Sequence, residues 1–402
     1  MADVTARTAL GGGHRRSGAD GGSAGESKGP GRAPGGPAVR VASLAWLGRT
    51  GLIMAVASLA YVGVWRPPCP WCSLARGPAF WLAQTLSDSH CGDGQVAVSG
   101  AVEVLLSTYN GERYLHQQLE SVWGQSYPEV ALSVRDDGSS DATLSLFDGL
   151  LSGRPHAKLV MGAHLGAAQS FMSLLRSVGT TSSYAAFCDQ DDVWAPDKLA
   201  VAVGALDDLE EPGRPALYCS AVTLVREDLT EIKVHRRCTR DPSFENALVE
   251  NVATGCTIVV NRPAIDLLSR RRPEHLLMHD AWCYLVVAGC GEVVYDRVPH
   301  VLYRLHQANT VGVGTTLWSE WSGRVRRQLE QGKERTLTAQ AKEVSRLYRP
   351  DLKPSAACSL QAFLSSQSSP TRRLHYAVSG GAYRQRFIDD LVYRSLYLAR
   401  RV

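Results

Sequence analysis

The chain has 402 residues, of which 45% are hydrophobic and 20% are charged, and its mean hydropathy is −0.12. These values exclude a disulfide-stapled miniprotein, a polytopic transporter and a chain that is disordered throughout. The net charge of +4 is too small to predict a nucleic-acid partner. The ten cysteines are dilute and mostly lie in apolar runs, which predicts buried, reduced thiols in a cytosolic-type compartment.

Residues 1–40 contain 11 of the 37 glycines and no aromatic residue, which predicts a disordered tail. Residues 41–100 form an apolar extension of uncertain structure. Its stretch from 41 to 65 is interrupted by Arg49, and the uninterrupted part is shorter than the roughly 20 residues that span a bilayer. We therefore do not expect a membrane span, although a single transmembrane segment at 41–65 remains the alternative.

Cys69 and Cys72 form a CxxC pair within this extension. Such a pair is typical of a redox site or of half a zinc site, but the sequence contains no second CxxC to complete a zinc site. We interpret the pair as incidental and keep a thiol oxidoreductase role as a minor alternative.

From residue 101 onward, strand-like apolar runs alternate with helical patterns. Strand-like runs are predicted at 102–110, 130–134, 158–161 and 184–188, and the first of them ends in polar residues. Helices are predicted around 115–122, 142–151 and 169–178, with Asp141 as the N-cap of the second helix. This alternation predicts a mostly parallel sheet flanked by helices. A further helix is expected after Arg272-Pro273.

Polar or acidic clusters follow three of these strands. Ligands of parallel sheets bind beyond the carboxyl ends of the strands, so these clusters predict a ligand site. Asp136 and Asp137 are suited to accept a hydrogen bond from a nucleobase or a ribose. Asp189, Asp191 and Asp192 repel one another unless a cation neutralises them, and oxygen ligands suit Mg²⁺ or Mn²⁺. The alternative is a capped turn at Asp136–Asp141 and a solvated acidic loop.

Several motifs together resemble one enzyme family. They are Ser107-Thr-Tyr-Asn110-Gly, Gln125-Ser-Tyr, Asp136-Asp137-Gly-Ser-Ser-Asp141 and Asp189-Gln-Asp191-Asp192-Val-Trp-Ala-Pro-Asp197-Lys198. In this order and spacing they resemble the inverting nucleotide-sugar glycosyltransferases of family 2, most closely the rhamnosyltransferase branch. The resemblance implies a GT-A fold and covers about residues 101–312.

The resemblance also implies roles for individual residues on the donor side. Ser107 and Thr108 would lie against the nucleotide. Asp137 would accept the imide N–H of a pyrimidine, with Asp136 supporting the turn. The loop after the third strand departs from the family, because His164 and its neighbours stand where asparagines are usual.

Four residues are assigned by the resemblance to the metal and the diphosphate. Asp189 and Asp191 would form the DxD pair, with Asp191 contacting the metal directly. Asp192 would contact the sugar or support the metal ligands. His306, in a terminal motif that runs from Tyr303 to Gly312, would approach the metal or the diphosphate.

The acceptor side is assigned to two later segments. Gly255 lies in a stretch that resembles the family's glycine-containing acceptor region, and Trp282 follows the expected base. That base is Asp280, within Met278-His-Asp280-Ala-Trp282. Inversion needs one carboxylate to take the proton of the acceptor hydroxyl, which is the role expected of Asp280.

Residues 313–402 are predicted to be basic and helical, with Trp318 and Trp321 at helical spacing among arginines. A basic amphipathic helix suits a membrane surface, and packing against the catalytic domain is the alternative. We therefore expect a cytoplasmic, metal-dependent glycosyltransferase that contacts the inner membrane face peripherally and acts in cell-surface polysaccharide synthesis. Its donor would be dTDP-rhamnose or a UDP-sugar, and its acceptor a saccharide or lipid-linked saccharide. The alternative function is a membrane-associated binding or scaffold protein on a retired transferase fold.

Overall fold

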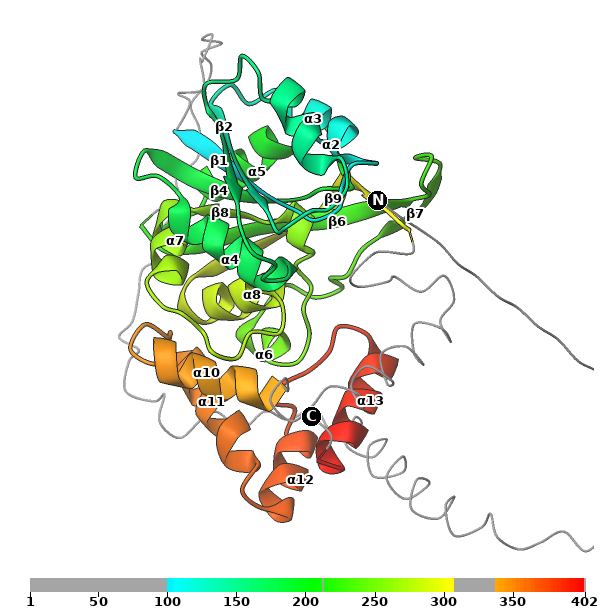
Figure 1. Ribbon diagram of the computed structural model, residues 1–402. Coiled ribbons are helices and arrows are strands. Elements are labelled where there is room, and N and C mark those ends of the chain that lie inside the picture. Colours follow the sequence, from blue (N-terminus) through cyan, green and yellow to red (C-terminus); the bar gives the residue numbers. More distant parts are fainter. Residues whose placement is uncertain (1–99, 212, 307–336, 401–402) are drawn as a thin grey trace, which may run out of the picture. The chain divides into compact units, whose positions relative to one another are not determined.

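The computed structural model describes residues 100–211, 213–306 and 337–400 (Figure 1). The glycine-rich tail, the apolar extension, the Cys69–Cys72 pair and the Trp318 segment lie outside these residues. None of the helices within the described ranges is both long enough and apolar enough to cross a membrane. The seven cysteines described are free thiols, and five of them are buried, as expected for reduced core residues.

A curved mixed sheet of nine strands organises the fold. Its path is β3-β2-β1-β4-β8-β6-β9-β5, and β7 pairs with β6 off this path. The first four strands along the path are parallel, whereas β8 runs antiparallel to both β4 and β6. The strands are β1 (Ala101–Thr108), β2 (Val130–Asp136), β3 (Ala157–Met161), β4 (Ser182–Asp189), β5 (Val193–Trp194), β6 (Ala216–Val225), β7 (Glu231–His235), β8 (Val259–Asn261) and β9 (Glu292–Arg304).

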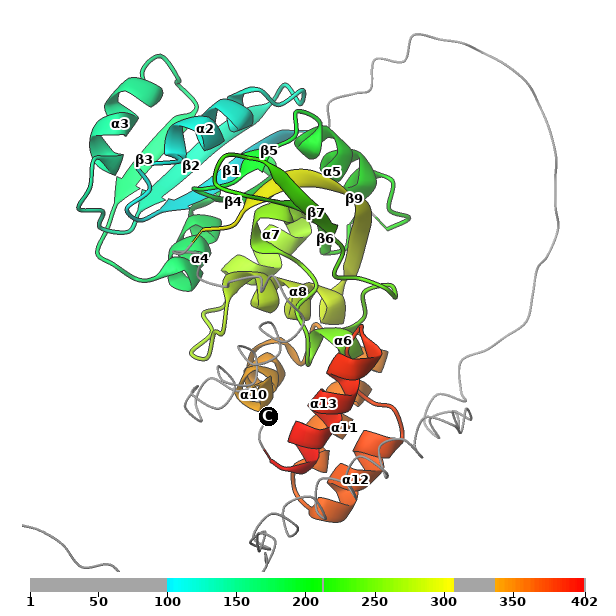
Figure 2. The same ribbon diagram turned by 90° about the vertical axis from the view of Figure 1, so that its right-hand side faces the viewer.

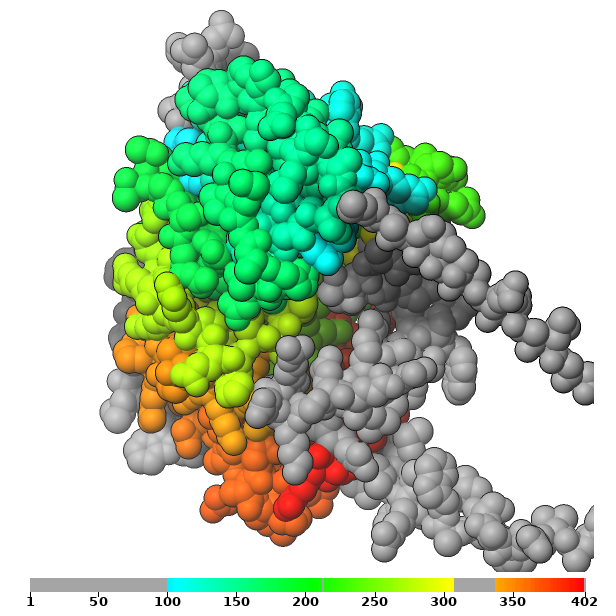
Figure 3. Space-filling view, viewed as in Figure 1, coloured from blue at the N-terminus to red at the C-terminus, as the bar shows by residue number. Residues whose placement is uncertain are grey.

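Alternating side chains of the central strands feed two cores on opposite faces of the sheet. In β4, Phe187 belongs to one core and its neighbours Ala186 and Cys188 belong to the other. Figure 2 shows α2 and α3 over one face of β1–β3 and α4 over the other. In the space-filling view, the side chains of residues 100–211 (cyan to green) form one continuous surface (Figure 3). This layered α/β arrangement places the carboxyl ends of β1, β2, β3 and β4 along one edge, because these strands are parallel.

The helices of the first half agree with the periodicity of the sequence. α2 buries Leu115, Leu119 and Val122, which share one face. Asp141 is not the N-cap of α3, since Ala142 holds that position; instead, Asp141 accepts hydrogen bonds from the Thr143 amide and hydroxyl. The flanking helices are α2 (Leu115–Trp123), α3 (Thr143–Leu150), α4 (Ala167–Ser177) and α5 (Lys198–Asp207).

The following part of the chain adds further helices around β6, whose residues are all buried. These are α6 (Phe244–Ala247), η1 (Gly255–Thr257), α7 (Arg262–Ser269) and α8 (His279–Cys290). α8 begins six residues beyond Pro273, later than the sequence predicts. In the segment before α8, the Glu274 amide donates to the Glu343 carboxylate, which lies more than sixty residues further along the chain.

Four helices follow at the carboxyl end of the described chain, namely α10 (Leu337–Tyr348), α11 (Pro354–Ser366), α12 (Pro370–Val378) and α13 (Phe387–Leu398). Tyr348 of α10 packs edge-to-face on Trp282 of α8, with ring centroids 5.9 Å apart. Gln385 accepts hydrogen bonds from the amides of Thr239 and Arg240. These contacts join the helices to the sheet-containing part through apolar packing and backbone hydrogen bonds.

Candidate active site

The turn after β2 is built around the Asp136 carboxylate. This group accepts hydrogen bonds from the amides of Gly138 and Ser139 and from the Ser139 hydroxyl. Gly138 has a φ of +89°, which residues with a Cβ rarely adopt. Asp136 is only 1% exposed, so its carboxylate holds the turn and has little surface for a ligand.

Asp137 is buried in a second network that joins β2 to the loop after β3. Its carboxylate pairs with the Arg135 guanidinium and accepts hydrogen bonds from the amides of Leu165 (2.9 Å) and Gly166 (2.7 Å). The Nδ1 atom of His164 lies 3.1 Å from the same carboxylate. A carboxylate offers about four acceptor positions, so the protein itself uses the acceptor capacity of Asp137.

The hydroxyls at the end of β1 are also engaged within the protein. Ser107 donates to Ser170 at 2.7 Å, and Thr108 donates to the Gln190 side chain at 2.7 Å. The Gln190 amide also bonds both the N–H and the C=O of Tyr109. A Cβ at Gly111 would collide with Gln190, so glycine at this position makes room for the bridge. Gln190 thereby ties the end of β1 to the acidic loop.

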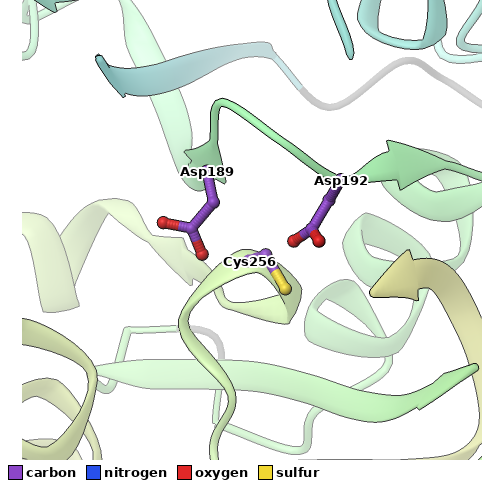
Figure 4. Close-up of side chains that lie close together, drawn as sticks. All are labelled: Asp189, Asp192 and Cys256. Atoms are coloured by element: carbon purple, nitrogen blue, oxygen red, sulfur yellow. The ribbon is translucent and has the colours of Figure 1, made fainter. Parts of the chain in front are cut away.

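The acidic loop after β4 brings two carboxylates and a thiol together. One ligand atom from each of Asp189, Asp192 and Cys256 lies within 4.8 Å of the others (Figure 4). Burial and the charge of Asp191 raise the pKa of Asp192 to about 7. Burial and the charges of Asp192, Asp191 and Asp280 likewise raise the pKa of Asp189. Full ionisation of this cluster is therefore electrostatically unfavourable, and binding of a proton or a cation would reduce the repulsion.

Asp191 projects differently from its two acidic neighbours. Its Oδ2 atom lies 2.7 Å from Nε2 of His306, which is the last residue described after β9. Arg304 also fixes the loop, because its amide donates to Asp192 and its guanidinium to the Asp191 carbonyl. The end of β9 therefore places both the His306 imidazole and the Arg304 guanidinium against the acidic loop.

Asp280 lies in the first turn of α8, beside η1. A Cβ at Gly255 would lie 3.7 Å from the Asp280 Cβ and 3.0 Å from Nε2 of His279. His279 is buried beside Phe171 and Phe187, and burial lowers its pKa to about 4. Glycine at position 255 thus permits the close approach of η1 to the first turn of α8.

Trp282 occupies a different place from the one expected. It is fully buried in the core and contacts Tyr348, so its side chain does not line the acceptor region. The reason is the helical geometry: a residue two positions after Asp280 on α8 points to another face of the helix. The assignment of Trp282 to the acceptor region was therefore wrong.

The residues present fit a divalent cation. Asp191 and His306 provide a partly accessible carboxylate–imidazole pair, and Asp189 and Asp192 belong to the same loop as Asp191. The Oδ2 atom of Asp192 is buried and has no hydrogen-bond partner among the described residues. A donor set of carboxylates and one imidazole suits Mn²⁺ well, and Mg²⁺ when water completes the sphere.

Three structural contributors were missed by sequence reasoning. Arg135 neutralises Asp137, Gln190 bridges two loops, and Cys256 lies beside Asp192. Only Arg135 carries a local signal, since it is a charged residue inside an apolar strand. The partners of Gln190 and Cys256 are more than sixty residues away along the chain.

Comparisons with known proteins agree with this geometry. Residues 103–266 match the model of the glycosyl transferase family 2. The chain is 27% identical over 231 residues to the dTDP-rhamnosyl transferase RfbG of Shigella flexneri, covering 54% of this chain and 76% of the relative. It is 26% identical over 164 residues to the putative teichuronic acid biosynthesis glycosyltransferase TuaG of Bacillus subtilis, covering 40% of this chain and 62% of the relative.

Among solved structures, the S. aureus TarS fragment 1–349 in complex with UDP-GlcNAc aligns with a TM-score of 0.44 at 12% identity, covering 74% of this chain and 90% of that one. The family match is consistent with the parallel first half of the sheet and with the acidic loop at the end of β4. Residues 103–266 of the chain therefore match the glycosyl transferase family 2, and this part has the layered α/β architecture described above.

Proposed function

We propose that this enzyme transfers a sugar, specifically rhamnose, from a nucleoside diphosphate to a saccharide or lipid-linked saccharide, with inversion at the anomeric carbon. The observation that carries the proposal is the convergence of four carboxylates from two distant segments. Asp189, Asp191 and Asp192 follow β4, and Asp280 begins α8 close enough for its charge to raise the pKa of Asp189.

The proposed chemistry is a single displacement. The Asp280 carboxylate takes the proton of the acceptor hydroxyl, whose oxygen bonds to the anomeric carbon as the bond to the diphosphate breaks on the opposite face. His279 does not compete for this proton, because burial lowers its pKa to about 4. One carboxylate is sufficient, and no protein nucleophile is required.

Asp191 and His306 would hold a divalent cation, with Asp189 and Asp192 supporting them. The bound cation would supply positive charge to the departing diphosphate. Ser107 and Thr108 would then shape the nucleotide site through their side-chain bonds to Ser170 and Gln190. Asp136 would do so through the turn that its carboxylate stabilises.

The donor and the biological setting are proposed from the relatives. RfbG is named as a dTDP-rhamnosyl transferase, which favours dTDP-rhamnose over a UDP-sugar as the donor. TuaG is named for teichuronic acid biosynthesis, which favours a role in cell-surface polysaccharide synthesis. Exposed Phe387 and Ile388 beside exposed Arg386 favour peripheral contact with the inner membrane face, with residues 101–312 as the catalytic domain.

A transfer assay with dTDP-rhamnose and Mn²⁺ tests the proposal. Asp280→Asn should abolish transfer while leaving nucleotide binding intact, and Asp191→Ala should abolish transfer and weaken the response to Mn²⁺. A thermal-shift series with dTDP, UDP and GDP would identify the base, because a ligand that binds the folded state raises the melting temperature. Transfer that survives both substitutions would refute the proposed chemistry.

A further inference from the structure

The loop after β3 presents an exposed imidazole whose orientation is fixed from two sides. The His164 ring lies 4.5 Å from the Tyr109 ring, centroid to centroid. Its Nδ1 atom lies 3.1 Å from the Asp137 carboxylate and 3.2 Å from the Asp137 carbonyl oxygen. The side chain is nevertheless 59% exposed. An exposed ring that is held by a carboxylate and by a second ring is preorganised to meet a ligand.

The backbone of this loop is held as firmly as the ring. Arg135 pairs with Asp137 and donates to the Ala163 carbonyl oxygen at 2.8 Å. The amides of Leu165 and Gly166 both donate to Asp137. Asp137 therefore serves the conformation of residues 163–166, and its acceptor positions are filled by protein donors.

A base that approaches this edge of the sheet consequently meets His164. With Nδ1–H donating to Asp137, the other ring nitrogen carries a lone pair and can accept a hydrogen bond. Nε2 of His164 has no hydrogen-bond partner among the described residues. Uracil and thymine present an imide N–H, which such an acceptor would bind, whereas the corresponding ring nitrogen of cytosine carries no hydrogen.

We propose that His164 is the residue that recognises the imide N–H of the donor's nucleobase, and that Asp137 is a positioning residue that fixes the His164 ring. This inference rests on the proposed function, since it requires a nucleoside diphosphate at the carboxyl edge of β1–β3. It assigns base specificity to a side chain of the loop instead of to the buried aspartate.

The test compares variants that keep or remove the acceptor atom. His164→Phe keeps a planar ring beside Tyr109 but removes both nitrogens. His164→Gln can place an amide oxygen near the position of Nε2 and should therefore preserve the preference for UDP over CDP. His116→Ala is the matched control, because His116 is an exposed histidine on α2 that pairs with Glu120 on the same helix. Full-length proteins would be titrated calorimetrically with UDP and with CDP in the presence of Mn²⁺.

The wild-type protein and His116→Ala should bind UDP more tightly than CDP. His164→Phe should lose about five- to tenfold in UDP affinity, the usual effect of one hydrogen bond, and should no longer distinguish the two ligands. His164→Gln should retain most of the preference.

If His164→Phe keeps the full preference for UDP over CDP, the inference is wrong while the proposed function stands. If the wild-type protein binds UDP, dTDP and GDP no better than a buffer blank, both are wrong.

Discussion

His306 Nε2 and Asp191 Oδ2 lie 2.7 Å apart although 115 residues separate them in sequence. The pair joins the end of β9 to the acidic loop and leaves both side chains partly accessible. His306→Ala should therefore raise the Mn²⁺ concentration needed for half-maximal activity by about one to two orders of magnitude, because one ligand is lost. The measurement is the transfer rate as a function of Mn²⁺ concentration. The control variant His116→Ala should leave this curve unchanged. An unchanged curve for His306→Ala would show that His306 is not a metal ligand.

Gly255→Ala tests the close approach of η1 to α8. The added methyl would lie 3.0 Å from the His279 ring, and that ring packs against both Phe171 and Phe187. We expect a loss of about 1–3 kcal/mol of unfolding free energy from overpacking, with a fall in kcat as the adjacent Asp280 shifts. Denaturant unfolding and steady-state kinetics would separate the two effects. Gly204→Ala is a control, since nothing lies within 4 Å of a Cβ there.

Buried His279 makes a pH-dependent contribution to stability. Its pKa falls to about 4 in the folded protein because burial disfavours the charged form, whereas the unfolded chain titrates near 6.5. The unfolded state therefore binds more protons between these values. The contribution is complete above pH 6.5 and falls towards pH 4 by about 1.4 kcal/mol per unit.

His279→Phe should remove this part of the pH dependence, because it replaces the titratable ring beside Phe171 and Phe187 with an apolar one. The check is the unfolding free energy of both proteins from pH 4.5 to 7.5. Parallel curves over this range would show that His279 is not the group responsible.

Asp192 makes a contribution to the pH dependence of stability that is opposite in sign to that of His279. Its pKa is raised to about 7 by burial and by Asp191, so the folded protein binds more protons than the unfolded chain between about pH 4 and 7. Without metal, stability should decrease as pH rises through this window, and Asp192→Asn should flatten that decrease. Melting temperatures at pH 5.5 and 7.5, with and without Mn²⁺, would measure it. The stabilisation by Mn²⁺ should be larger at pH 7.5, where protons compete less.

Trp282 should matter for folding and not for recognition of the acceptor. Its side chain is fully buried against Tyr348, so Trp282→Ala should cost about 3–5 kcal/mol and Trp282→Phe less. For the folded fraction of Trp282→Phe, the KM for the acceptor should match that of the wild type. A selective increase in this KM would show that Trp282 contributes to acceptor binding.

The first half of the fold follows from local patterns, whereas the second half does not. β1, β2 and β4 are apolar runs that end in polar clusters, and α2 repeats Leu115, Leu119 and Val122 on one face. β8 and β9 pair with β6 across long separations, and no local period specifies that pairing. The segment before α8 likewise depends on a distant partner, since the Glu274 amide donates to Glu343 of α10.

The candidate site divides in the same way. The sequence identifies the aspartates, because clusters at strand ends converge in a parallel sheet. It does not reveal that Ser107 is bonded to Ser170, or that Asp137 is surrounded by Arg135 and the loop amides. These partners depend on which loops meet in space, so residue type predicted where the site lies but not which of its atoms remain free for a ligand.

The Gln190 bridge has a mechanical consequence. One amide group holds Thr108 and Tyr109 at the end of β1 while its backbone belongs to the acidic loop between Asp189 and Asp191. The two loops are therefore clamped to each other, and a displacement of either one is transmitted to the other through a single side chain. Any movement of the region around Tyr109 would shift the carboxylates that follow β4. A substitution at position 190 would therefore change the positions of both the end of β1 and the acidic loop.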